Sequence, residues 1–133
     1  MRKRAALGLV LAAVLAWPAA LAPFYVAAWR TGLPGSRGGP QDAFRHVLAS
    51  AFAARYISPR FVDWVTAGSE RGRGRHARMD RHNNRVGRDL GAQGGGPGEL
   101  YRRVKAKVAA GRVNAEDPDV VTWLPESQWT SGL

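Results

Sequence analysis

The feature that most constrains this chain is a run of 25 uncharged residues close to its N-terminus, from Ala5 to Trp29. At a rise of about 1.5 Å per residue, a helix of this length crosses the hydrocarbon layer of a membrane, which is about 30 Å thick. The chain has 133 residues, so about 95 remain for one small soluble domain. Two interpretations of the run are open, a retained transmembrane anchor and a cleaved signal peptide.

The anchor is the favoured interpretation, because Pro23 makes a poor cleavage context after Ala22 and the apolar residues continue beyond it. Residues 2–4 are all basic, so the positive-inside rule places the N-terminus in the cytoplasm. We therefore expect a single-pass protein of the cell membrane, held by residues 5–29, with its domain outside the cytoplasm. If the segment is cleaved, the domain is secreted or periplasmic.

The rest of the chain shows helical apolar patterns separated by glycine and proline. We predict an all-α fold. A membrane anchor or signal helix covers residues 1–30, and a Gly/Pro linker covers residues 31–41. A small bundle of about four helices follows within residues 42–133. The helices are expected over residues 43–56, 61–69, 79–90 and 99–110, with Asp42 as the N-cap of the first, a loop over residues 71–78, and Val120–Leu124 as a short strand or an apolar tail.

The net charge is +10, and its densest part is the arginine-rich segment from Arg71 to Arg88. Such a segment can attract anionic lipid or another phosphate-bearing ligand, or can be a solvated face without a partner. Export and the absence of aromatic residues for base stacking argue against nucleic acid. His76 and His82 lie within the segment and are expected at the surface. Cysteine is absent, which excludes disulfides and thiolate metal sites.

The helix predicted over residues 79–90 carries polar residues on its apolar side. An amide or a carboxylate that faces a core is costly unless another group pairs with it. We therefore expect the chemistry of the chain in this helix. The apolar residues are Met79, Val86 and Leu90, and the polar or small residues among them and beside them are Asp80, Asn83, Asn84 and Gly87.

His46 lies about opposite Phe44 on the first predicted helix, on a face of small residues. Small residues let a second backbone or a substrate approach the ring, and Asp42, four residues earlier, can fix the tautomer of the imidazole. The alternative is that His46 is exposed to solvent and Asp42 only caps the helix. Gly87 is expected to allow close packing of its helix against this one.

The motifs D-A-F-R-H and M-D-x-x-N-N-x-x-G resemble those of a family of small bacterial domains of unknown function. Members are found alone behind signal or membrane segments and inside larger secreted or phage-borne proteins. The resemblance covers residues 42–91 and implies a site but no known reaction. Many members have His before the glutamate that precedes the second motif, whereas this chain has Ser69. The residues that correspond are Arg45, His46, Glu70, Asp80, Asn83, Asn84 and Gly87.

A histidine and two carboxylates in one cleft suffice to activate water by general-base catalysis, or to hold a divalent metal ion. The leading hypothesis is a hydrolase of an envelope ester or phosphoester, with His46 as general base. The predicted catalytic residues are His46, Glu70, Asp80, Asn83 and Asn84, in which the two asparagines donate hydrogen bonds to an oxyanion or a phosphate.

Arg45 and Asp42 are predicted as substrate-binding or structural partners, and Arg45 is expected to pair with Asp80 or Glu70. The first alternative is a non-catalytic envelope protein in which Arg45, Asp80 and Asn83 form a buried structural cluster. The second is a basic patch that binds anionic lipid or nucleic acid.

Overall fold

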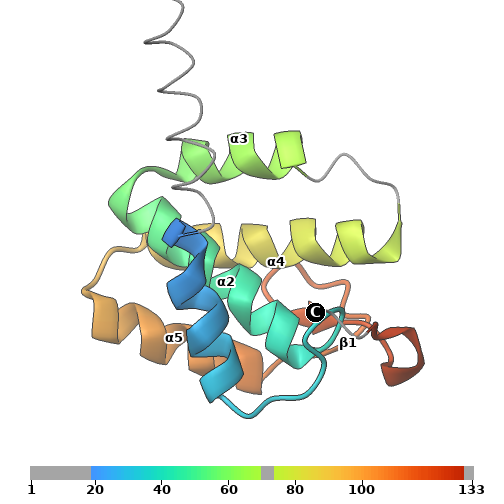
Figure 1. Ribbon diagram of the computed structural model, residues 1–133. Coiled ribbons are helices and arrows are strands. Elements are labelled where there is room, and N and C mark those ends of the chain that lie inside the picture. Colours follow the sequence, from blue (N-terminus) through green and yellow to red (C-terminus); the bar gives the residue numbers. More distant parts are fainter. Residues whose placement is uncertain (1–18, 70–73, 131–133) are drawn as a thin grey trace, which may run out of the picture.

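The computed structural model describes residues 19–69 and 74–130, and they are mostly helical, which confirms the predicted all-α class (Figure 1). Two very short strands pair in parallel after the last α-helix, with Arg112 opposite Thr122. After a helical segment over residues 19–30, the elements are α2 (Pro40–Tyr56), α3 (Pro59–Ser69), α4 (Arg75–Ala92), α5 (Pro97–Ala109), β1 (Arg112–Val113), β2 (Thr122–Trp123) and the 3₁₀ helix η1 (Glu126–Gln128).

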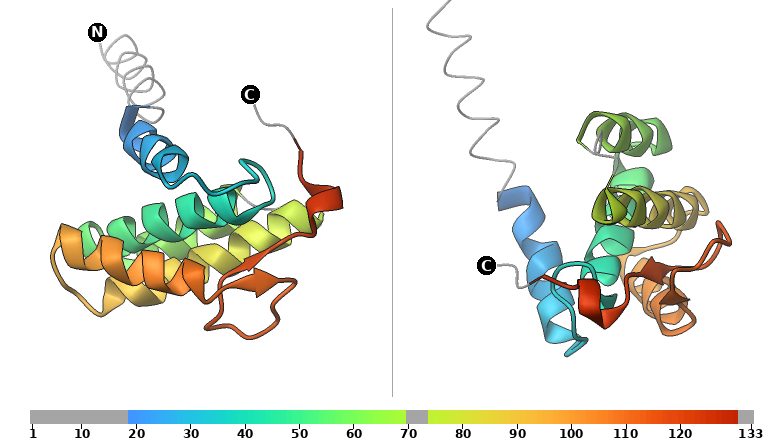
Figure 2. Two further views of the ribbon diagram at one scale, coloured as in Figure 1. Left: turned by 90° about the horizontal axis from the view of Figure 1, so that it is seen from below. Right: turned by 90° about the vertical axis from the view of Figure 1, so that its right-hand side faces the viewer.

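The centre of the fold is the pair α2 and α4, whose backbones approach very closely. A Cβ atom at Gly87 would lie 2.3 Å from the carbonyl oxygen of Val47, and one at Gly91 would lie 2.1 Å from that of Ala51. Only glycine leaves room for this approach, so the packing role predicted for Gly87 is confirmed. α3 and α5 lie on opposite sides of the pair (Figures 1 and 2).

The apolar sides of α2, α4 and α5 form the core, and that of α4 is the one predicted from Met79, Val86 and Leu90. On α3, Val62 is buried and Trp64 is 73% exposed, because, among the elements α2 to η1, this helix packs on α2 and α4 and turns its other side to solvent. Asn83 is completely buried among the apolar residues of α4, as the sequence pattern predicts. The buried apolar residues of the three faces are Phe44, Val47, Leu48, Ala51, Met79, Val86, Leu90, Leu100, Val104 and Val108.

All four predicted helices begin two to four residues earlier in the structure, and α2 and α4 differ most. α2 begins at Pro40 with Gly39 as its N-cap, and Asp42 in the first turn accepts a hydrogen bond from the backbone N–H of Gly38 (2.9 Å) instead of capping the helix. Proline suits the first helical position because its φ is preset and it has no N–H to satisfy. α4 begins at Arg75, so residues 75–78, which were expected in a loop, are helical.

The predicted linker is folded against the domain. The backbone N–H of Leu124 donates to the carbonyl of Gly38 (2.8 Å), and that of Thr130 donates to Arg37 (3.1 Å). The chain reverses here with the help of Gly35 and Gly38, whose φ angles of 75° and 91° favour glycine. Residues 31–39 therefore connect α2 with the C-terminal segment and are not a loose tether.

Histidines of α4 hold the C-terminal segment, which corrects the expectation that they are surface residues. Nε2 of His76 donates to the carbonyl of Gln128 (3.2 Å), and Nε2 of His82 donates to that of Val120 (2.6 Å). Both side chains are half-buried, because the segment after α5 returns across α4 and brings backbone acceptors to them. β2 and η1 are thereby attached to the helical pair.

Residues 19–30 contact the domain along one side only. Ala28 belongs to the core and Phe24 packs edge-on against Phe52, while Tyr25 and Trp29 are exposed. In the part of the chain that the structure describes, we find no helix with both the length and the apolar character that crossing a membrane requires. The predicted membrane segment begins within residues 1–18, outside the described residues.

Candidate functional site

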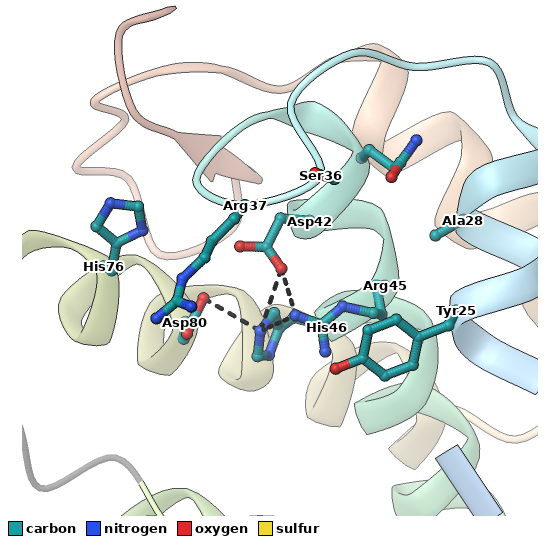
Figure 3. A pocket seen from close by; sticks show the side chains of 10 residues that line it. Tyr25, Ala28, Ser36, Arg37, Asp42, Arg45, His46, His76 and Asp80 are labelled. Carbon is teal, nitrogen blue, oxygen red and sulfur yellow. Dashed lines mark hydrogen bonds and ion pairs between the residues drawn. The ribbon is translucent and has the colours of Figure 1, made fainter. Parts of the chain in front are cut away.

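The two predicted motifs meet beside a pocket of about 400 Å³ between α2, α4 and the loop before α2 (Figure 3). Nε2 of His46 lies 3.2 Å from a carboxylate oxygen of Asp80 and 3.5 Å from one of Asp42. Figure 3 shows His46 between Tyr25 at one end of the pocket and His76 at the other. The side chains that line the pocket are Tyr25, Ala28, Ser36, Arg37, Gln41, Asp42, Arg45, His46, His76 and Asp80.

Asn84 orients the imidazole of His46 from the opposite helix. Nδ1–H of His46 donates to the side-chain carbonyl oxygen of Asn84 (3.0 Å), which also accepts from the hydroxyl of Ser50 (3.2 Å). The amide nitrogen of Asn84 donates to the hydroxyl of Thr66 on α3 (3.2 Å). This arrangement holds the proton of a neutral ring on Nδ1, so that the lone pair is on Nε2, which faces the two carboxylates.

The surroundings of Nε2 suit a base. A neutral ring cannot donate from Nε2 while Nδ1 carries the proton, so Nε2 accepts, and Nη2 of Arg45 lies 3.1 Å from it. Once Nε2 has taken a proton, the carboxylates of Asp42 and Asp80 become its acceptors. They stabilise the imidazolium by their charge, although they lie at the nitrogen that takes the proton, whereas the carboxylate of a catalytic triad contacts the other ring nitrogen.

Arg45 pairs with Asp42, three residues earlier, rather than with Asp80. The guanidinium of Arg45 also lies 4.4 Å from the centre of the Tyr25 ring, a cation–π contact that attaches the helix of residues 19–30 to the site. Asp42 is 3% exposed, and its second oxygen accepts from Gly38, so its charge is compensated. Glu70 lies outside the described residues.

Asn83 does not belong to the pocket. Its amide nitrogen donates to the carbonyl of Thr122 (2.8 Å), and its carbonyl accepts from the backbone N–H of Thr122 (3.0 Å). Consecutive residues of an α-helix point about 100° apart, so only one of the two asparagines can face His46. The expected oxyanion donor at position 83 and the alternative cluster of Arg45, Asp80 and Asn83 are therefore both wrong, since Asn83 binds β2.

The site can also hold a divalent metal ion. Asp42, His46 and Asp80 each offer one ligand atom, and these three atoms lie within 4.8 Å of one another. Carboxylate oxygen and imidazole nitrogen together suit Zn²⁺, Mn²⁺ or Fe²⁺. Nη2 of Arg45 lies close to two of the three ligand atoms, so an ion bound there would displace the guanidinium.

Several residues of the site were not predicted from the sequence. Ser50 follows His46 by about one helical turn, so its spacing was a usable signal. Thr66, Arg37 and Tyr25 carry no such signal, because they come from α3, the loop before α2 and the helix of residues 19–30. Only the packing of these elements brings them to α2.

Comparisons of the chain with known protein families, with curated proteins and with solved structures give no match. The resemblance of the two motifs to a family of bacterial domains therefore stays a prediction.

Proposed function

We propose that this protein is a hydrolase that cleaves an ester or a phosphoester, with His46 as its general base. The observation that supports the proposal most is the orientation of the ring. Nδ1 of His46 is held by Asn84, and Nε2 lies at a pocket with a carboxylate oxygen of Asp80 3.2 Å away. A base within hydrogen-bond reach of a bound water is the first requirement for this chemistry.

In the proposed reaction, Nε2 of His46 takes a proton from a water molecule while the water oxygen attacks the ester. The carboxylates of Asp80 and Asp42 stabilise the imidazolium that forms. The imidazolium then returns the proton to the leaving oxygen, so the ring ends in its starting state. Arg37 and Arg45 line the same pocket and supply positive charge for an anionic group of the substrate or for the developing oxyanion.

We also propose that the apolar run of residues 5–29 anchors the protein in the cell membrane, with the domain outside the cytoplasm and the residues that pack on the domain, 24–28, at the membrane surface. The exposed aromatic side chains of Tyr25 and Trp29 support this, since such residues are enriched where a membrane meets water. The arginines of α4 would attract anionic lipid headgroups, and Arg75, Arg78 and Arg85 are exposed. Vesicle sedimentation of the full chain tests both parts: we expect binding to neutral vesicles to persist at high salt, because an inserted apolar segment is not screened, and only the additional binding to anionic vesicles to be lost.

Hydrolysis of p-nitrophenyl esters and phosphoesters by the purified full chain tests the enzyme. We expect His46→Ala to lower kcat/KM by about 100-fold or more, because it removes the base. His82→Ala is the matched control, since this histidine contacts the carbonyl of Val120 and does not line the site pocket. Full activity of His46→Ala on every hydrolysed substrate would overturn the proposal.

A further inference from the structure

His46 and Arg45 separate two pockets of different character. The first is the polar pocket of the proposed active site. The second has a volume of about 270 Å³ and lies between α2, α3 and the helix of residues 19–30. His46 and Arg45 line both. The apolar side chains of the second pocket are Leu21, Ala49, Ala53, Phe61, Val62 and Val65.

The second pocket exists because α2 carries small residues where α3 faces it. Ala49 and Ala53 follow His46 at about one and two helical turns, and the larger side chains of Phe61 and Val65 form the opposite wall. Among the residues that the structure describes, Arg45 and His46 are the only charged or titratable groups of this lining, and they lie at the boundary with the polar pocket. Such a lining favours hydrocarbon over water.

The polar pocket offers the opposite chemistry. Arg37 can bind phosphate through charge-assisted hydrogen bonds and Ser36 is a further donor, whereas Arg45 also pairs with Asp42 and Gln41 donates to the carbonyl of Leu33 (2.9 Å). A substrate whose reactive bond lies at His46 can therefore place a hydrocarbon chain on one side of that bond and an anionic group on the other. This combination defines an anionic amphiphile.

We propose that the substrate is a phospholipid, held with an acyl chain in the apolar pocket and its phosphate in the polar pocket. This inference rests on the proposed hydrolase and makes its substrate class specific. The water oxygen bonds to the acyl carbon, and the bond from that carbon to the glycerol oxygen breaks. The proton passes from water to Nε2 of His46 and then to the glycerol oxygen. The products are a fatty acid and a lysophospholipid.

The position of the pockets suits a substrate that comes from a bilayer. The helix of residues 19–30 contributes Leu21 to the apolar pocket and Tyr25 to the polar one, and its N-terminal end points toward α3 (Figures 1 and 2). Large apolar side chains are exposed on this helix and around the turn from α2 to α3, where a membrane surface would cover them. They are Tyr25, Val26, Trp29, Tyr56, Ile57 and Trp64.

Photolabelling of the full chain tests the proposal without depending on turnover. The chain is placed in nanodiscs of diether phosphatidylcholine, which contain a little diether phosphatidylglycerol with a diazirine on one alkyl chain. We expect the label on peptides of α2 and α3 that contain Ala49 and Val65. Ala53→Phe fills the pocket and should lower this labelling at least about fivefold. Ala106→Phe on the exposed side of α5 is the control and should not change it.

A second variant tests the headgroup. Arg37→Gln should weaken labelling by phosphatidylglycerol, compared with a diazirine diglyceride that lacks the phosphate, whereas Arg102→Gln on α5 should not. Equal labelling of Ala53→Phe and the wild type on α2 and α3, or label confined to residues 5–30, would overturn the lipid site. Labelling as expected without hydrolysis of an ester phospholipid or of any soluble ester or phosphoester would overturn the hydrolase and leave a site that only binds lipid. Hydrolysis of a short soluble ester without labelling would overturn the lipid proposal alone.

Discussion

The side-chain carbonyl oxygen of Asn84 on α4 lies 3.0 Å from Nδ1 of His46 on α2. This contact joins the two sequence motifs, as the approach of His46 to Asp80 also does, and it decides which ring nitrogen faces the pocket. Asn84 is 6% exposed and is itself held by Ser50 and Thr66, so α2, α3 and α4 all determine the orientation of the ring. Asn84 is therefore a positioning residue, and its effect on the reaction acts through His46.

Replacement of Asn84 by leucine tests this positioning role. The variant removes the acceptor of Nδ1–H, and we expect kcat to fall by about tenfold or more, since the ring is no longer held with its lone pair on Nε2. ¹⁵N NMR of the ring nitrogens reports the tautomer directly. The wild type should carry its proton on Nδ1, and Asn84→Leu should lose this preference. An unchanged tautomer would contradict the role.

Replacement of Asn83 by alanine should give the opposite result. This side chain pairs with both backbone groups of Thr122, which is 6% exposed, so its loss leaves a buried donor and a buried acceptor unpaired. We expect the free energy of unfolding to fall by about 2–4 kcal/mol, measured by urea denaturation, with kcat per folded molecule retained. A variant of normal stability and low kcat would return Asn83 to the active site.

Replacement of Gly87 by alanine tests the close approach of α2 and α4. The new Cβ would lie 2.3 Å from a backbone oxygen, which cannot move without its helix. We expect the free energy of unfolding to fall by about 2 kcal/mol or more, and calorimetry to show a lower Tm. Gly68→Ala on α3 is the matched control, because a Cβ there meets nothing within 4 Å and alanine favours the helix. Equal Tm changes in the two variants would contradict the packing.

Removal of Arg45 tests the capacity for a metal ion. The guanidinium lies beside Asp42 and His46, so its charge opposes a cation at the same place. We expect Arg45→Ala to bind Zn²⁺ at least about tenfold more tightly than the wild type in calorimetric titrations, since about 1.4 kcal/mol suffices for this change. The double variant Arg45→Ala/Asp80→Asn should lose this increase in Zn²⁺ affinity. Equal affinities of Arg45→Ala and the wild type would show that Arg45 does not control the site.

The sequence alone determined the existence of the helices and, except for α3, their buried sides, because the 3.6-residue apolar period is a local property of the chain. It also identified His46, Asp80 and Asn84, since a polar side chain on a buried face must find a partner. The sequence alone did not determine that Asn83 binds β2 while Asn84 orients His46, because this depends on which element lies against each side of α4.

Only the tertiary structure decided how the site is completed. Arg37 and Tyr25 enter the pocket from segments that the sequence presents as a linker and a membrane run, and no periodicity connects such distant positions with α2. The folding of residues 31–39 against the C-terminal segment was likewise invisible, because it depends on backbone hydrogen bonds that any sequence can form. Local patterns determine helices, whereas a pocket forms only where several helices meet.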